Sequence, residues 1–124
     1  MARTIKKSTK LTKKELVIVR EVERRVRQES GGFQDNYCWL NGQRAAMCDD
    51  RLLYHEGLFR KPFSEGMAHA WNSINGKIVD FSLSAFHEKM HRYAKYYETE
   101  NAYTKKQVTD AFIARKCQWD WMKQ

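Results

Sequence analysis

The sequence predicts a single α+β domain in which helices flank a short antiparallel sheet. A chain of 124 residues has the length of one domain. Its apolar content of 42% and aromatic content of 13% are too high for a disordered chain and can supply one core. Helical periodicity marks both ends, whereas strand and hairpin signals occupy the middle. We expect a flexible basic arm over residues 1–11 and one domain over residues 12–124.

The first predicted helix covers residues 12–29. Thr12 and Glu15 form the Thr-x-x-Glu signature of a capping box, and Gly31-Gly32 ends the helix. Apolar side chains recur at helical spacing and are expected to face the core: Leu16, Val19, Val22 and Val26.

A second helix is predicted to run to about Asp49, with Asp35 or Asn36 as its cap. Gly in a helix interior lowers helix stability by about 1 kcal/mol relative to Ala, so the presence of Gly42 indicates that close packing requires a small residue there. Small side chains on one stripe would let this helix lie very close to a sheet: Cys38, Gly42 and Ala45.

Three strands are predicted in the middle of the chain, over Leu53–Phe59, Met67–Ser73 and Lys77–Leu83. Asn75-Gly76 lies between the last two and is a strong signal for a two-residue hairpin turn.

Two more helices are predicted after the strands. Helical spacing of Phe86, Met90, Tyr93 and Tyr97 indicates one over residues 85–97. A second capping box, Thr104 with Gln107, opens a last helix that would run to about Met122. Its buried side would be supplied by Val108, Phe112, Trp119 and Trp121.

Positive charge is concentrated at the N-terminus. The net charge is +8, and residues 1–29 hold ten Lys/Arg and four Glu, which is +6 of that total. Such a segment can contact an acidic protein or a nucleic acid. Aromatic residues are not interleaved with these charges as on a nucleic-acid stacking surface, so a solvated tail and helix face is the favoured interpretation.

The three cysteines, Cys38, Cys48 and Cys117, are too far apart for a structural zinc knot, and their odd number argues against a disulfide framework. The only apolar run near the start, Leu16–Val19, is too short for a signal-peptide core. No stretch is long enough to span a membrane. We expect a cytoplasmic protein, with Cys48 and Cys117 as packing residues.

The hairpin brings a histidine and an aspartate together. The turn pairs Ile74 with Lys77, and counting outward places Trp71 opposite Asp80. Because side chains alternate along a strand, His69, Trp71 and Asp80 share one face. His69 and Asp80 are then diagonal neighbours, roughly 7–8 Å apart at the backbone. A carboxylate there can accept a hydrogen bond from the imidazole, which fixes its tautomer and stabilises its charged form.

Cys38 would supply the nucleophile, with His69 as the base and Asp80 as the group that orients it. Three separate elements would thus provide the three groups that nucleophilic catalysis needs. Cys38 lies in the first turn of its helix, where the dipole and unpaired N–H groups favour a thiolate. Its backbone N–H could stabilise an oxyanion, and Gln34, Asn36 and Trp39 are the candidates for a second donor. Trp71 is a further candidate for a substrate contact.

Four short segments resemble the small transglutaminase-like and papain-like proteins, and together they lie within residues 33–83. The order Cys, His, Asp and the short His-to-Asp spacing also match. The segments are Asn36–Trp39 opening a helix, Tyr54–Gly57 on a strand, His69–Asn72, and Asn75–Asp80.

The resemblance implies a helix bearing the cysteine, packed on an antiparallel sheet that bears the histidine and the aspartate. It implies Cys38 as nucleophile, His69 as general base and Asp80 as the group that orients His69. Papain-like enzymes place a Gln before the cysteine for the oxyanion hole; Gln34 is the matching type, at a shorter spacing.

The expected function is acyl chemistry on an amide of a protein or peptide-like substrate, through a Cys38 thioester. Hydrolysis, deamidation and transfer to an amine share that intermediate, and none requires a cofactor or a metal. One alternative is a non-catalytic binding or inhibitor protein on the same fold. The other is a basic nucleic-acid-binding module.

His87-Glu88-Lys89-Met90-His91 matches the His-Glu-x-x-His motif of zinc metalloproteases. The motif is short, charged residues stand where such helices carry uncharged ones, and no third ligand is evident. We therefore expect a solvated polar helix face and no metal site.

Overall fold

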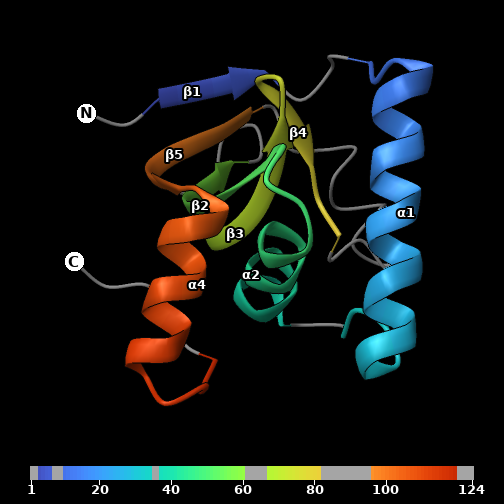
Figure 1. Cartoon of the computed structure of the whole chain (residues 1–124). Coiled ribbons are helices and arrows are strands. Elements are labelled where there is room, and N and C mark those ends of the chain that lie inside the picture. The colour runs from blue at the N-terminus through green and yellow to red at the C-terminus, as the bar shows by residue number, and fades with distance from the viewer. Residues whose placement is uncertain (1–2, 7–9, 35–36, 61–66, 82–95, 120–124) are drawn as a thin grey trace.

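The computed structural model describes residues 3–6, 10–34, 37–60, 67–81 and 96–119 (Figure 1). In chain order its elements are β1 (Arg3–Lys6), α1 (Lys13–Ser30), α2 (Cys38–Cys48), β2 (Leu52–Arg60), β3 (Met67–Ile74), β4 (Lys77–Val79), β5 (Tyr96–Tyr103) and α4 (Lys105–Ala114).

The strands form one five-stranded sheet in the order β1-β5-β2-β3-β4, and each pairing is antiparallel. β2 lies at the centre, with Leu52 opposite Ile74 of β3 and Tyr54 opposite Tyr103 of β5. The fold is therefore α+β, as the sequence predicted, with N- and C-terminal helices flanking the sheet. None of the described helices is both long and apolar enough to cross a membrane.

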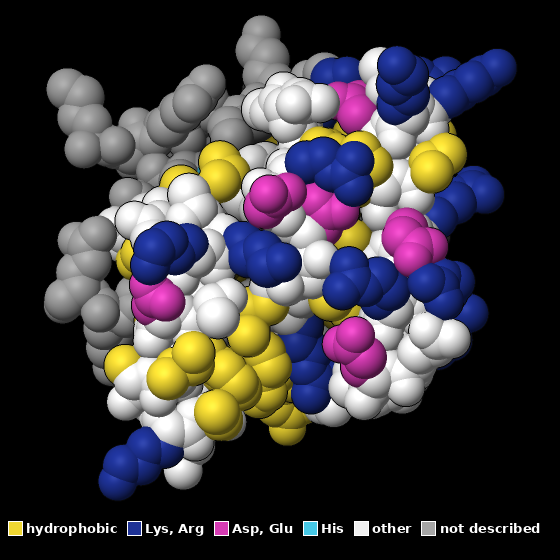
Figure 2. Space-filling view, in the orientation of Figure 1, with side chains coloured by type: hydrophobic (Ala, Val, Ile, Leu, Met, Phe, Trp, Pro, Cys, Tyr) yellow, Lys and Arg dark blue, Asp and Glu magenta, His cyan; other side chains and the backbone are white. Residues whose placement is uncertain are grey.

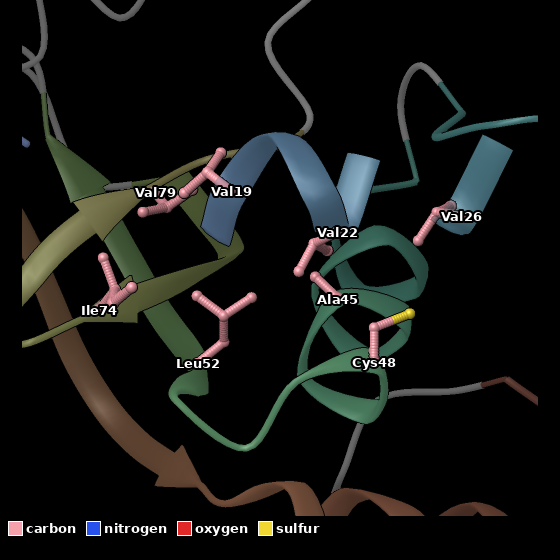
Figure 3. Packing of buried hydrophobic residues seen from close by; sticks show 8 residues of the cluster. All are labelled: Val19, Val22, Val26, Ala45, Cys48, Leu52, Ile74 and Val79. Carbon is pink, nitrogen blue, oxygen red and sulfur yellow. The ribbon is translucent and has the colours of Figure 1, made fainter. Parts of the chain in front are cut away.

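α2 lies between the sheet and α1 (Figure 1). One core cluster joins α1, α2 and three strands, and its side chains point toward one another in Figure 3. A second cluster joins α4 to the sheet and contains Val108 of α4 with Tyr54, Ala70 and Tyr103. The members of the first cluster are Val19, Val22, Val26, Ala45, Cys48, Leu52, Ile74 and Val79.

The capping box of α1 is confirmed. Thr12 accepts from the backbone N–H of Glu15, whose side chain accepts in turn from the N–H of Thr12. The predicted apolar face was wrong at Leu16, which is 39% exposed. Glu15 is buried instead, because its carboxylate also accepts from Asn75 at 2.9 Å and from Lys77 at 2.7 Å. These bonds tie the start of α1 to the β3–β4 turn.

α2 begins later than predicted. Its N-cap is Tyr37, which makes no side-chain capping bond, and Asp35 and Asn36 lie outside the described residues. The close approach to the sheet is confirmed: a Cβ added at Gly42 would lie 2.7 Å from Cδ1 of Tyr54.

The hairpin register is confirmed by the pairing of Ile74 with Lys77. Asn75 (φ 50°) and Gly76 (φ 77°) both have positive φ, as a type I′ turn requires. β4 is shorter than predicted and ends at Val79.

The structure has two strands that the sequence did not predict. Residues 82–95, which hold most of the predicted helix 85–97, lie outside the described residues. Its predicted end was wrong, because Tyr97 lies in β5 and pairs with Ile5 of β1. β1 lies within the segment expected to be a basic arm.

The capping box of α4 is confirmed, with Thr104 as N-cap and Gln107 as its partner. The helix ends at Ala114, earlier than predicted, and Lys116 and Cys117 then adopt positive φ. Cys48 is buried in the core as expected, whereas Cys117 is exposed, so its prediction as a packing residue was wrong.

Candidate active site

The β3–β4 hairpin positions His69 beside Asp80. Asn72 pairs with Val79, so the next residue, Asp80, lies opposite Trp71 and on the face of His69. Nε2 of His69 and Oδ2 of Asp80 are 2.6 Å apart, and their side chains are 12% and 2% exposed. The carboxylate is therefore almost fully removed from water, and the imidazole is more exposed than the carboxylate.

Cys38 lies at the N-terminal end of α2 and is half-buried. The C-terminal half of α2 packs on Leu52, whereas Cys38 packs against the cluster that contains Ala70. This orientation carries Cys38 to the His69 end of β3, where its side chain is close enough to raise the pKa of His69. The structure thus brings together all three residues of the predicted triad.

His69 is held in its charged form. Burial by itself is the largest single influence and lowers the pKa of this imidazole, whereas hydrogen bonds to Asp80 and Cys38 act in the opposite direction. Together with the charges of those two groups, they raise the pKa from 6.5 to about 9. The surroundings of His69 therefore favour its charged form.

Trp71 lies behind the imidazole and is not on the surface. It is 1% exposed, and its ring stacks on His69 at 6.0 Å between centroids and on His55 at 5.7 Å. Nε2 of His55 lies 2.6 Å from Oγ of Ser73, which fixes that ring in turn. Trp71 therefore packs against the imidazole and holds its plane.

The candidates for a second oxyanion donor lie in different surroundings. Gln34 is exposed. Trp39 is half-buried, and its ring makes an edge-to-face contact with the ring of the exposed Tyr37, with 6.1 Å between the ring centroids. Asn36 lies outside the described residues.

Sequence reasoning missed Asn41, which joins α2 to the backbone of Gln34. Its buried amide accepts from the N–H of Gln34 at 2.9 Å and donates to the carbonyl of Gln34 at 2.7 Å. The available signal was a polar side chain three residues after Cys38, in a helix otherwise predicted to pack on a sheet. Asn41 thus ties Gln34 to α2, the helix that begins at Cys38.

Sequence reasoning also missed a buried polar chain beneath α2. Arg115 donates to Oε1 of Gln43 at 2.9 Å, Gln43 donates to the hydroxyl of Tyr54 at 3.5 Å, and Tyr54 donates to Glu56 at 2.7 Å. Burial raises the pKa of Tyr54, and the charges of Glu56 and Cys38 act in the same direction. The alternation of Tyr54 and Glu56 on a strand was the available signal.

The residues of the His-Glu-x-x-His motif, His87 to His91, lie outside the described residues. Within the described parts of the chain, no group of three or more His, Cys, Asp or Glu side chains gathers as metal ligands would.

Comparison of the chain with protein-family models, with curated proteins and with solved structures found no match in any of the three.

Proposed function

We propose that this protein carries out acyl chemistry through a thioester on Cys38, on a small transglutaminase-like or papain-like fold. The observation that carries the proposal is the position of His69, whose Nε2 lies 2.6 Å from Oδ2 of Asp80 and whose pKa is also raised by the neighbouring Cys38. Because Nε2 faces the carboxylate, Nδ1 is left for the sulfur. A nucleophile, a base and an orienting group in this order are what covalent catalysis by a thiol needs.

In the proposed reaction the Cys38 thiolate attacks the carbonyl carbon of an amide. The His69 imidazolium then gives its proton to the leaving nitrogen, the C–N bond breaks, and a thioester remains on Cys38. Water or an amine next attacks the thioester, His69 takes a proton from it, and the C–S bond breaks. The sulfur leaves as a thiolate, so the starting ion pair is restored.

Asp80 has a positioning role in this scheme. Its buried carboxylate holds Nε2 of the ring and stabilises the imidazolium, which supports the pKa of about 9. The proposed substrate is an amide in a protein or peptide. A reducing compartment such as the cytoplasm suits a nucleophilic thiol, and Cys38, Cys48 and Cys117 are all free thiols.

Acylation by p-nitrophenyl acetate, followed by intact mass and peptide mapping, tests the proposal. We expect one acetyl group on Cys38, released by hydroxylamine and lost in Cys38→Ala. Cys117→Ala is the matched control, because it removes the exposed thiol and should keep the adduct.

A wild-type protein that neither accumulates an acetyl group on Cys38 nor releases p-nitrophenolate faster than Cys38→Ala, or that is acetylated on Cys38 no faster than on Cys117, would contradict the proposal. The alternative of a binding protein on the same fold would then take its place. A salt-dependent shift of DNA or RNA by the unacylated protein would favour the nucleic-acid-binding alternative.

A further inference from the structure

A recess lies at the far end of α2 from Cys38, where the C-terminal halves of α1 and α2 meet the segment after α4. It has a volume of about 310 Å³. This is at the lower end of the range for small-molecule sites. Its walls include Arg25, Val26, Glu29, Arg44, Met47 and Trp119.

Arg44 has a hydrogen-bond donor that the described residues leave unused. Its Nη1 is buried and has no acceptor among them. The guanidinium carbon lies 5.4 Å from the ring centroid of Trp119, a cation–π contact that occupies a face of the guanidinium and not its N–H groups. A buried donor without an acceptor costs roughly 1–3 kcal/mol. An acceptor placed in the recess would remove that cost.

Arg25 adds a second guanidinium from the facing helix. Its Nη1 donates to the carbonyl of Cys48, the last residue of α2, at 2.7 Å. This bond offsets the negative end of the α2 dipole, which would otherwise disfavour an anion by about 0.3–1 kcal/mol. Two guanidinium groups and one carboxylate, that of Glu29, line the recess, so positive charge is in excess among its lining residues.

The rest of the lining is largely apolar. Val26 and Met47 face the recess with Trp119, which is fixed by its contact with Phe112 at 4.1 Å between centroids. Figure 2 shows hydrophobic side chains gathered on this face, beside basic and acidic ones. Such a surface can cover the body of a ligand whose charged end reaches the arginines.

We propose that this recess binds a small organic carboxylate with an apolar body, its carboxylate on Arg44 and its body against Met47 and Trp119. Guanidinium groups suit this ligand because their paired N–H groups match the two oxygens of a carboxylate. Arg44 lies six residues after Cys38, about 9 Å along the helix axis, so the site is separate from the nucleophile. The proposal does not depend on acyl chemistry.

Titration calorimetry of the full-length protein with three probes tests the proposal. Benzoate carries the carboxylate and an apolar ring, benzamide has the same shape without the charge, and phosphate has the charge without the ring. We expect saturable binding of benzoate, with benzamide and phosphate weaker by about tenfold or more. Equal affinity for benzoate and benzamide would overturn the anion site, and tighter binding of phosphate would overturn the apolar subsite. Failure of benzoate to bind would overturn both.

Substitution of Arg44 locates the site. Arg44→Met keeps an apolar stem over Trp119 and should weaken benzoate by about tenfold or more, whereas Arg44→Lys keeps the charge and should weaken it less. Arg24→Met is the matched control, because Arg24 is exposed on α1 and pairs with Glu21. Comparable loss in Arg24→Met, or an unchanged affinity in Arg44→Met, would overturn the assignment to this recess.

Discussion

Oδ2 of Asp80 lies 2.6 Å from Nε2 of His69, across a hairpin whose two central residues are Asn75 and Gly76. The contact is diagonal: β4 ends at Val79, and Asp80 turns toward the half of β3 that precedes its pairing with β4. The hairpin that folds locally thus also builds the acid–base pair, and only Cys38 has to be supplied from another element.

The His69–Asp80 pair predicts a particular dependence of stability on pH. The pKa of His69 rises from 6.5 to about 9 on folding, so the folded state binds the proton more tightly than the unfolded state. The stabilisation is complete below about pH 6.5 and is lost as the pH rises to about 9. A shift of this size corresponds to at most about 3 kcal/mol. Urea denaturation from pH 6 to 10 measures it.

His69→Gln is the control for that experiment, because it keeps a polar side chain and removes the titrating group. Its free energy of unfolding should change less than that of the wild type between pH 6.5 and 9. A wild-type curve that is flat over this window, or that slopes upward, would show that Asp80 does not hold the charged imidazole.

Thiol reactivity provides a second prediction, and it separates activation from exposure. Cys117 is exposed, whereas Cys38 is half-buried. If exposure alone decided the rate, Cys117 would react first. We expect iodoacetamide at neutral pH to label Cys38 faster by about tenfold or more, because the neighbouring His69 can act as the base for its thiol. Peptide mapping over time gives both rates in one sample.

The same labelling assay ranks the other two triad residues. His69→Ala should slow the reaction of Cys38 strongly, because it removes the cation beside the sulfur. Asp80→Ala should slow it less, because it removes only the group that holds the ring. An unchanged rate of Cys38 labelling in His69→Ala would contradict the proposed triad. If His69→Ala, Asp80→Ala and Cys38→Ala all destabilise the protein to the same extent, the three residues form a structural cluster and not a catalytic site.

Asn41 should matter for both stability and reactivity. Asn41→Ala removes the two hydrogen bonds to the backbone of Gln34, which should cost roughly 1–3 kcal/mol, and should slow the labelling of Cys38. Asn41→Asp keeps the acceptor for the N–H of Gln34 but loses the donor to its carbonyl. Comparison of the two variants therefore separates the contributions of the two hydrogen bonds. Labelling that is unchanged in folded Asn41→Ala would restrict Asn41 to a structural role.

Local signals explain how much of this fold could be predicted from the sequence. Each of the two capping boxes depends on two residues three positions apart, and the hairpin turn depends on the adjacent Asn75 and Gly76. All three features are confirmed. Alternation along the hairpin then placed His69 and Asp80 on one face without knowledge of the rest of the sheet.

The features that were missed depend on distant pairing. β5 carries few of the period-two signals of a half-buried strand, and its place between β1 and β2 comes from partners that are 36 or more residues away in the sequence. The contact of Asn41 with Gln34 crosses from a helix to a loop, and the position of Glu15 depends on Lys77. No spacing rule within one segment contains this information.

Gly42→Ala tests whether the stripe of small residues is needed to seat Cys38. A Cβ at this position would lie 2.7 and 2.8 Å from two ring carbons of Tyr54. That ring is fully buried and its hydroxyl donates to Glu56 at 2.7 Å, so it cannot turn away freely. Ala gains about 1 kcal/mol of helix propensity over Gly, but overpacking of about 3 kcal/mol exceeds it. We expect a net loss of about 2 kcal/mol in urea denaturation.

A double-mutant cycle identifies the neighbour responsible for that loss. The cost of Gly42→Ala should shrink in a Tyr54→Leu background, where the ring is gone, and persist in Tyr54→Phe, where the ring remains. α2 carries Cys38 and packs on Tyr54 through Gly42, so a shift of the helix should also slow iodoacetamide labelling of Cys38. A Gly42→Ala variant as stable as the wild type would mean that α2 does not need this close approach to Tyr54.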